Sequence, residues 1–194
     1  MTRLLDACAV PLPAPTVARA VGALRAGEVV AIPTDTVYGL AADPRVPGAT
    51  SALFALKGRP PEVALPVLVA SVEQALAVAG PDVAQPALAL VERWWPGGLT
   101  VVVPRREGLG WELGGSDQST VGLRLPAHPV PVALAGALGP LAVSSANRHG
   151  RPTPATAPEV IEELGPGLAL ALDGGPCRGA ASTVVSCIEG TVRV

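Results

Sequence analysis

The chain has 194 residues, of which 49% are hydrophobic and 15% are charged, and its formal net charge is −2 at pH 7. This length and composition suit a single domain, 1–194, with ample apolar material for a core. The slightly acidic balance gives no general sign of nucleic-acid binding, and no apolar run reaches the roughly 18–20 residues that cross a bilayer.

Export and metal binding are not indicated either. The first apolar stretch, Leu4-Leu5, is far shorter than the roughly 7–15 residues of a secretory signal, so we expect a cytoplasmic protein with no membrane segment. The three cysteines are odd in number and lack CxxC spacing, which predicts reduced thiols in place of a disulfide framework. With only two histidines available, we expect no metal site built from protein side chains.

The first half of the chain is predicted to alternate between helices and strands. Residues 16–27 show helical spacing of apolar side chains, with Thr16 as the N-cap and Gly27 as the stop. Residues 28–32, EVVAI, then predict a strand. A short helix (49–57), a buried strand (65–70) and a helix whose Ser71 and Gln74 fit a capping box (71–80) follow in that order.

The second half continues this alternation. Residues 105–119 are rich in glycine and charge and have no periodicity, so we expect a flexible loop there. Thr156 and Glu159 fit a second capping box at the start of a helix. In chain order, the expected elements are a helix (86–95), strands (99–104 and 120–126), a helix (130–139), a strand (140–144), a helix (156–165) and two closing strands (168–172 and 182–188).

Strand–helix alternation predicts an α/β fold with an at least partly parallel sheet. The strands at 99–104 and 120–126 follow one another without a helix between them, which indicates an antiparallel portion. We therefore expect a twisted, mixed parallel and antiparallel sheet with flanking helices.

Residues 32–40, IPTDTVYGL, are an unusual exit from a core strand. A plain connection would use Gly, Asn, Ser or Pro for turn geometry. This one instead supplies two threonines, an aspartate and the only tyrosine of the chain. Open α/β sheets bind their ligands beside strand ends, so we expect this segment to line a ligand site.

Five polar segments lie where predicted strands or helices end, at 33–40, 57–60, 119–126, 144–147 and 182–185. Each has an ordinary structural explanation: hydroxyls cap strand ends, and Lys57 and Arg59 could complement a helix dipole. Arg124 lies in an apolar strand and needs a carboxylate or phosphate partner, either a substrate or an internal group such as Asp173. Together these segments predict an anion- or nucleotide-binding domain that works by positioning its ligands, without a P-loop.

Six motifs in this order, PTDTVYGL, KGRP, WPGGLTVVVP, VGLRLPAHP, SSAN and STVV, resemble the YrdC-like family of threonylcarbamoyl-adenylate synthases over residues 16–194. The resemblance implies a twisted sheet with a concave cavity. It also implies an enzyme, a nucleotidyltransferase that joins L-threonine, bicarbonate and ATP, accompanied by Mg²⁺, into threonylcarbamoyl-AMP and pyrophosphate. Threonylcarbamoyl-transferase partner proteins would then modify tRNA, and direct contact with tRNA or RNA is a further expectation.

The resemblance also assigns roles to individual residues. It implies that Thr34, Arg124 and Ser182 bind threonine, and that Lys57 and Arg59 carry the catalytic charge on the nucleotide phosphates. Asp35 and Tyr38 are interpreted as supporting groups that order the first motif. The remaining nucleotide-side positions are Thr120, Ser145, Asn147 and Thr153. Two features depart from the family pattern: Val63 replaces a polar or basic residue, and no arginine-bearing tail follows the last predicted strand.

Two alternative functions compete with this interpretation. An RNA-binding or ribosome-associated module without activity should carry many cations and stacking aromatics, whereas this chain has 14 Lys plus Arg and 3% aromatic residues. A carbamoyl-transfer domain of hydrogenase maturation proteins shares the motifs. Those proteins are much larger chains with cysteine-rich segments that this sequence lacks.

Overall fold

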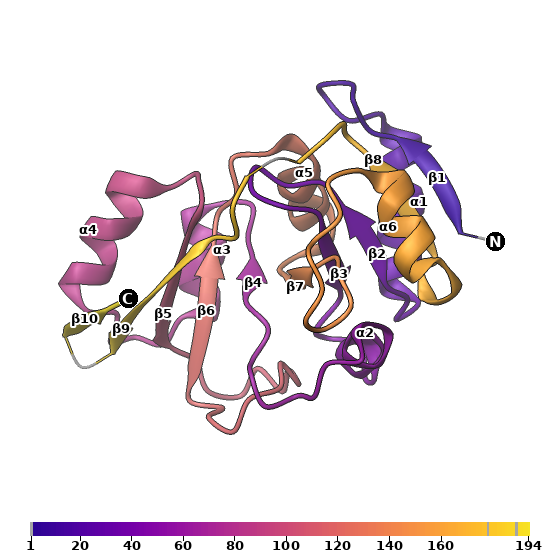
Figure 1. Cartoon of the computed structure of the whole chain (residues 1–194). Helices are drawn as coiled ribbons and strands as arrows, with labels where there is room; N and C mark the ends of the chain where they lie inside the picture. The colour runs from indigo at the N-terminus through magenta and orange to yellow at the C-terminus, as the bar shows by residue number, and fades with distance from the viewer. Residues whose placement is uncertain (1, 178, 189) are drawn as a thin grey trace.

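One sheet runs through the whole molecule (Figure 1). The computed structural model describes residues 2–177, 179–188 and 190–194, and among these residues the strand order is β1-β8-β2-β3-β7-β4-β6-β5-β9-β10. The strands are β1 (Arg3–Asp6), β2 (Val30–Ile32), β3 (Gly39–Ala42), β4 (Val67–Leu68), β5 (Leu99–Pro104), β6 (Thr120–Arg124), β7 (Leu141–Ser145), β8 (Leu170–Asp173), β9 (Thr183–Ile188) and β10 (Thr191–Arg193).

The sheet is mixed, as the sequence predicts. β8 pairs in parallel with β1 and β2, and β6 and β9 pair in parallel with β4 and β5 respectively. The remaining neighbours are antiparallel, including the expected pair of β5 and β6. The prediction of a mixed α/β sheet with flanking helices is therefore confirmed.

Helices cover both faces of this sheet. Apolar residues of α1 and α5 pack with Val30 and Ile32 of β2 on one face, whereas α2, α3, α4 and α6 pack with Ala31 on the other. This division follows from the alternation of side chains along a strand. None of the described helices combines the length and apolar character needed to cross a membrane. The helices are α1 (Ala14–Arg25), α2 (Ala49–Lys57), α3 (Val72–Val78), α4 (Gln85–Trp94), α5 (Pro129–Leu138), α6 (Ala157–Leu164) and the 3₁₀ turn η1 (Gly165–Gly167).

The predicted start of the first helix is wrong. The helix begins at Ala14, before Thr16, because Pro15 fits the first turn, where its missing N–H costs no hydrogen bond. The predicted stop at Gly27 agrees with the structure, since α1 ends at Arg25 and Gly27 has a φ of +80°.

The two predicted capping boxes differ in outcome. The box of Thr156 and Glu159 is present in full at the start of α6. At the start of α3, Ser71 accepts from the Gln74 backbone N–H, as predicted. The reciprocal bond is displaced by one residue, because the Gln74 side chain accepts from the N–H of Ala70.

Three strands were missed by sequence reasoning, namely β1, β3 and β10. β3 consists of Gly39, Leu40 and two alanines, so its composition carries little strand preference. It is a strand because β2 and β7 pair with it on both sides. Likewise, β10 is an exposed edge strand that exists only through its pairing with β9.

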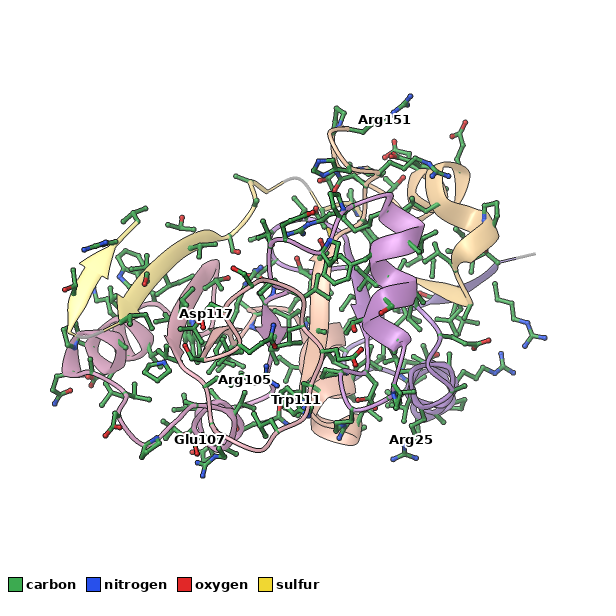
Figure 2. The ribbon with its side chains drawn as sticks, turned by 90° about the horizontal axis from the view of Figure 1, so that it is seen from below. Arg25, Arg105, Glu107, Trp111, Asp117 and Arg151 are labelled. Atoms are coloured by element: carbon green, nitrogen blue, oxygen red, sulfur yellow. The ribbon has the colours of Figure 1, made fainter. Side chains whose placement is uncertain are left out.

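The segment 106–119 contains no helix or strand, in agreement with the predicted loop. Arg105 lies at its start and donates to the backbone carbonyl of Trp111 and to the side chain of Gln118, at 2.8 and 3.2 Å. Figure 2 shows Arg105, Trp111 and Asp117 together in this part of the molecule. The side-chain contacts of Arg105 thus link the beginning, the middle and the end of the loop.

Candidate functional site

The segment 33–38 is a loop between two central strands, β2 and β3. A second segment, residues 174–177 and 179–182 between β8 and β9, is called the connector here and lies against this loop. Three contacts tie the two together: the Tyr38 hydroxyl donates to Gly175 O at 2.8 Å, the Gly179 N–H donates to Thr36 O at 3.0 Å, and the Cys177 thiol contacts Thr34 O at 3.2 Å. Tyr38, which we interpreted as a supporting group, thus contributes one of the bonds between the two segments.

A cavity of about 230 Å³ lies where these two segments meet the sheet. In its lining, Arg124 and Val143 lie on the sheet face that carries α1 and α5, because they alternate with the oppositely packed Leu123 and Ala142. Its lining includes six of the predicted site residues: Thr34, Tyr38, Arg59, Arg124, Ser145 and Ser182. The other lining residues are Thr36, Val37, Gly39, Pro66, Leu68, Thr100, Val143, Ser144, Ala181 and Val184.

Arg124 is 5% exposed and has an internal carboxylate partner. Its Nη2 lies 2.6 Å from Oδ1 of Asp35, while Asp173 accepts from the Gly175 N–H instead. Burial lowers the pKa of Arg124, an effect that the charge of Asp35 partly offsets, and the guanidinium keeps its proton as arginines do in proteins. Asp35, which we interpreted as a supporting group, forms an ion pair with this arginine.

Two further bonds hold the same guanidinium. Nε donates to Gly97 O at 2.9 Å and Nη1 donates to Oγ1 of Thr36 at 2.9 Å. A guanidinium has five N–H groups, so the bonds within the described chain leave one N–H on each terminal nitrogen of Arg124. Two N–H groups on separate nitrogens match the two oxygens of a carboxylate.

Lys57 ends α2, and its side chain is buried, with the residue only 3% exposed. Its amine donates to the backbone carbonyls of Ser145 and Asn147, the latter at 2.7 Å. Burial, assisted by the positive charge of Arg59, lowers the pKa of Lys57 to about 8. Lys57 therefore joins the end of α2 to the segment that follows β7.

Arg59 is half-buried and lies at the edge of the cavity. Its Nη1 donates to Oγ of Ser144 and its Nη2 to the carbonyl of Val63, both at 3.1 Å. The guanidinium also lies 5.9 Å from the ring centroid of Phe54, within the range of a cation–π contact. These contacts place a positive charge beside the cavity. Val63 contributes only its backbone carbonyl to this arrangement, and its side chain is exposed.

Ser182 lies on the opposite wall. Its Oγ is 2.9 Å from Oγ1 of Thr100, and the neighbouring Thr183 N–H donates to Gly98 O. Thr100 faces the cavity because it alternates with the buried Leu99 and Val101 on β5. The connector and β5 are thereby joined at the cavity wall.

The other predicted nucleotide-side residues lie outside the cavity lining. Asn147 bonds to the backbone carbonyls of Arg148 and Arg151, and Thr153 donates to the Asn147 side chain at 3.3 Å. Thr120 shares the sheet face of Arg124 but lies at the other end of β6, where it donates to Asp117 at 3.1 Å. Figure 2 shows Asp117 and Arg151 on well-separated sides of the molecule. The structure thus groups Asn147 with Thr153 and keeps Thr120 apart from them.

Three polar cavity residues were not among the predicted site residues: Thr36, Thr100 and Ser144. Thr36 could have been found, since it lies inside the opening motif between two residues that were chosen. Thr100 sits in an apolar strand, and no local pattern distinguishes it.

No cluster of three or more His, Cys, Asp or Glu side chains with the geometry of a metal site is found in residues 2–177, 179–188 and 190–194.

Comparisons with known proteins show which family this chain belongs to. The family model Sua5/YciO/YrdC, described as telomere recombination, matches residues 22–194. A protein of Mycobacterium tuberculosis is 43% identical over 178 residues, covering 90% of this chain and 80% of that protein. A protein of Bacillus subtilis named threonylcarbamoyl-AMP synthase is 38% identical over 177 residues, which cover 90% of this chain and 51% of that protein.

A solved structure adds a ligand to the comparison. The crystal structure of Pyrococcus abyssi Sua5 complexed with L-threonine superposes with a TM-score of 0.84 at 33% identity. The match covers 96% of this chain and 54% of that chain, so the present chain spans about half of it.

Proposed function

Since this chain belongs to the Sua5/YciO/YrdC family, we propose that it condenses L-threonine, bicarbonate and ATP to L-threonylcarbamoyl-AMP and pyrophosphate. The observation that carries this proposal is Arg124, a buried arginine with one N–H left on each terminal nitrogen at the wall of a cavity. The relatives do not favour an RNA-binding module without activity.

The chemistry needs little acid–base assistance from the protein. The amine of threonine and bicarbonate form a carbamate and release water. A carbamate oxygen then attacks the α-phosphorus of ATP, and the bond to pyrophosphate breaks as the new P–O bond forms. Holding carbamate and ATP in line can contribute roughly 7–11 kcal/mol to lowering the barrier, so the main task of the site is positioning.

The described side chains divide this task. Arg124 binds the threonine carboxylate through its two remaining N–H groups, and Thr34 and Ser182 complete the threonine pocket. Arg59 and Lys57 neutralise phosphate charge, with Lys57 acting after its amine exchanges a backbone carbonyl for a phosphate oxygen. Ser145, Asn147, Thr153 and Thr120 are the proposed contacts to the rest of the nucleotide.

Mg²⁺ enters with ATP in this proposal. The ion would be held mainly by phosphate oxygens and water, an arrangement that Mg²⁺ commonly adopts. Its contribution would be to neutralise charge on the phosphates, beside Lys57 and Arg59.

The product is a reactive mixed anhydride, and its threonylcarbamoyl group passes to an adenosine of tRNA through partner proteins. We therefore propose that the protein works in the cytoplasm, where ATP and tRNA are both present. Direct contact between this chain and tRNA is a separate part of the proposal. A titration of tRNA affinity against salt tests it, since contacts to phosphates weaken steeply as salt rises.

The decisive experiment measures pyrophosphate release from ATP by the purified chain. We expect release only when L-threonine and bicarbonate are both present, because the carbamate is the attacking group. Omission of each component in turn provides the controls. Equal release without threonine would overturn the assignment.

A further inference from the structure

Thr36 lies at the junction of four separate segments. Its hydroxyl contacts Arg124 of β6 and Thr34 of the loop 33–38, at 2.9 and 3.0 Å. Its backbone carbonyl accepts from Gly179 of the connector. On its methyl side it faces Gly98, where an added Cβ would lie 3.4 Å from Cγ2 of Thr36. Thr36 is 8% exposed, so these contacts fix it almost completely.

The hydrogen bonds around Thr36 have a definite direction. Thr34 Oγ1 lies 2.6 Å from Val37 O, which can only accept, so this contact uses the single hydroxyl hydrogen of Thr34. Thr36 must then donate to Thr34, and its own oxygen accepts from Arg124, which can only donate. The result is a chain of bonds from Arg124 through Thr36 and Thr34 to Val37.

The contacts of the Arg124 guanidinium show why this chain matters. Gly97 O accepts a hydrogen bond from Nε, and Asp35 accepts one from Nη2. Among the described residues, Thr36 is the acceptor for Nη1. An acceptor on each nitrogen fixes the plane of the guanidinium as well as its position. Without the Thr36 hydroxyl, Nη1 would lose its acceptor, and the rigid guanidinium could tilt and carry both remaining N–H groups out of line with a bound carboxylate.

We propose that Thr36 is a positioning residue for threonine recognition, acting through Arg124 by fixing the orientation of its guanidinium. This inference rests on the proposed function, in which Arg124 binds the threonine carboxylate. It also identifies Thr34 and Arg124 as one hydrogen-bonded unit, because Thr36 connects the two residues.

The test compares Thr36→Val, which keeps the shape and removes the hydroxyl, with Thr36→Ser, which keeps the hydroxyl. Thr36→Val should raise the KM for threonine about tenfold, the cost of one bond to a charged group, and the KM for ATP by less than about twofold. Thr36→Ser should restore most of the threonine affinity. Thr50→Val is the matched control, because Thr50 is a buried threonine of α2 outside the cavity lining and its loss should leave both KM values unchanged.

A double substitution tests whether Thr36 acts through Arg124. In an Arg124→Lys background, Thr36→Val should raise the threonine KM by no more than about twofold, since the guanidinium that Thr36 orients is already absent. A full tenfold effect in that background would overturn the inference. So would an equal rise of both KM values in Thr36→Val, or a failure of Thr36→Ser to restore affinity.

A second readout does not depend on the reaction. ¹⁵N NMR of the Arg124 side chain should show separate Nη1 and Nη2 signals in the wild type, because each nitrogen is held, and merged signals in Thr36→Val. Unchanged signals in that variant would overturn the positioning role even if the wild-type protein proved inactive. A wild-type protein without threonine-dependent pyrophosphate release, but with this change of signals, would refute the proposed function alone.

Discussion

The amine of Lys57 lies 2.7 Å from the backbone carbonyl oxygen of Asn147, 90 residues later in the chain. The same amine donates to the carbonyl of Ser145. One side chain therefore fixes the end of β7 and the segment that follows it, where Asn147 and Thr153 lie hydrogen-bonded to each other. Lys57, a proposed phosphate-binding residue, therefore also fixes the loop that contains Asn147 and Thr153, two further proposed nucleotide contacts.

This relationship predicts that Lys57→Met destabilises the protein. Methionine keeps most of the aliphatic stem but removes the donors, so two backbone carbonyls lose their partner. We expect the free energy of unfolding to fall by about 1–3 kcal/mol, measured by urea denaturation. Arg25→Met is the control, because Arg25 lies exposed in the last turn of α1 (Figure 2) and its loss should change stability by less than about 0.5 kcal/mol. Equal stability of both variants would contradict the bracing role.

Lys57 should also make stability depend on pH. Its pKa in the folded chain is about 8, below the ordinary value of 10.5. Between these values the unfolded chain binds the proton and the folded chain does not, so the free energy of unfolding rises with pH there. The stability of the wild type relative to Lys57→Met should therefore grow from pH 8 to pH 10. Urea denaturation at several pH values measures this difference, and a constant difference would show that the amine does not titrate in this range.

Arg59→Ala should mainly weaken ATP binding. Arg59 is half-buried, and its bonds to Ser144 and Val63 lie near solvent, so we expect a stability loss below about 1 kcal/mol. The KM for ATP should rise by at least about tenfold, since one charge-assisted bond to a phosphate is lost. Arg93→Ala is a matched control, because Arg93 also lies over an aromatic ring, 5.6 Å from that of Trp94, but outside the cavity lining. Similar ATP constants in both variants would argue against a phosphate contact.

Arg124→Lys should affect both threonine binding and stability. Lysine keeps the charge, but it cannot hold Gly97, Thr36 and Asp35 at once and still present two parallel N–H groups. We expect the threonine KM to rise about ten- to hundredfold, with a much smaller change for ATP.

Arg45→Lys separates the two effects of the Arg124 substitution. Arg45 forms a two-bond pair with Asp43 at 2.7 and 2.8 Å and donates to Leu138 O, outside the cavity lining. Its replacement should lower the melting temperature and leave the threonine KM unchanged. If Arg124→Lys behaves in the same way, the arginine only braces the sheet.

Gly179→Ala should disturb the cavity through the connector. An added Cβ would lie 2.7 Å from the backbone oxygen of Thr36, a contact that the two backbones must relieve by moving apart. We expect a loss of about 1–3 kcal/mol in the free energy of unfolding and a raised KM for threonine. Gly22→Ala is the control: no atom lies within 4 Å of its added Cβ on α1, so it should stabilise the protein by about 0.4–1 kcal/mol. An unchanged threonine KM in Gly179→Ala would show that the connector does not shape the cavity.

The sequence by itself determined the class of the fold and the segments that form the site. The spacing of apolar residues differs between helices and strands and can be seen within a short stretch of sequence. It therefore predicted the helices and most of the strands. The hydroxyls and cations of the motifs were visible for the same reason, and six of the predicted residues do line one cavity. The capping box of Thr156 and Glu159 is likewise a local interaction, and it forms as predicted.

Only the tertiary structure decided which of these groups are partners. Arg124 pairs with Asp35, 89 residues away, and Lys57 is buried against carbonyls of a distant strand end. β3 is a strand because β2 and β7 lie on either side of it, although its glycine and alanines show no strand preference. Burial and pairing depend on segments that are brought together by packing of the whole sheet, and no local pattern carries that information.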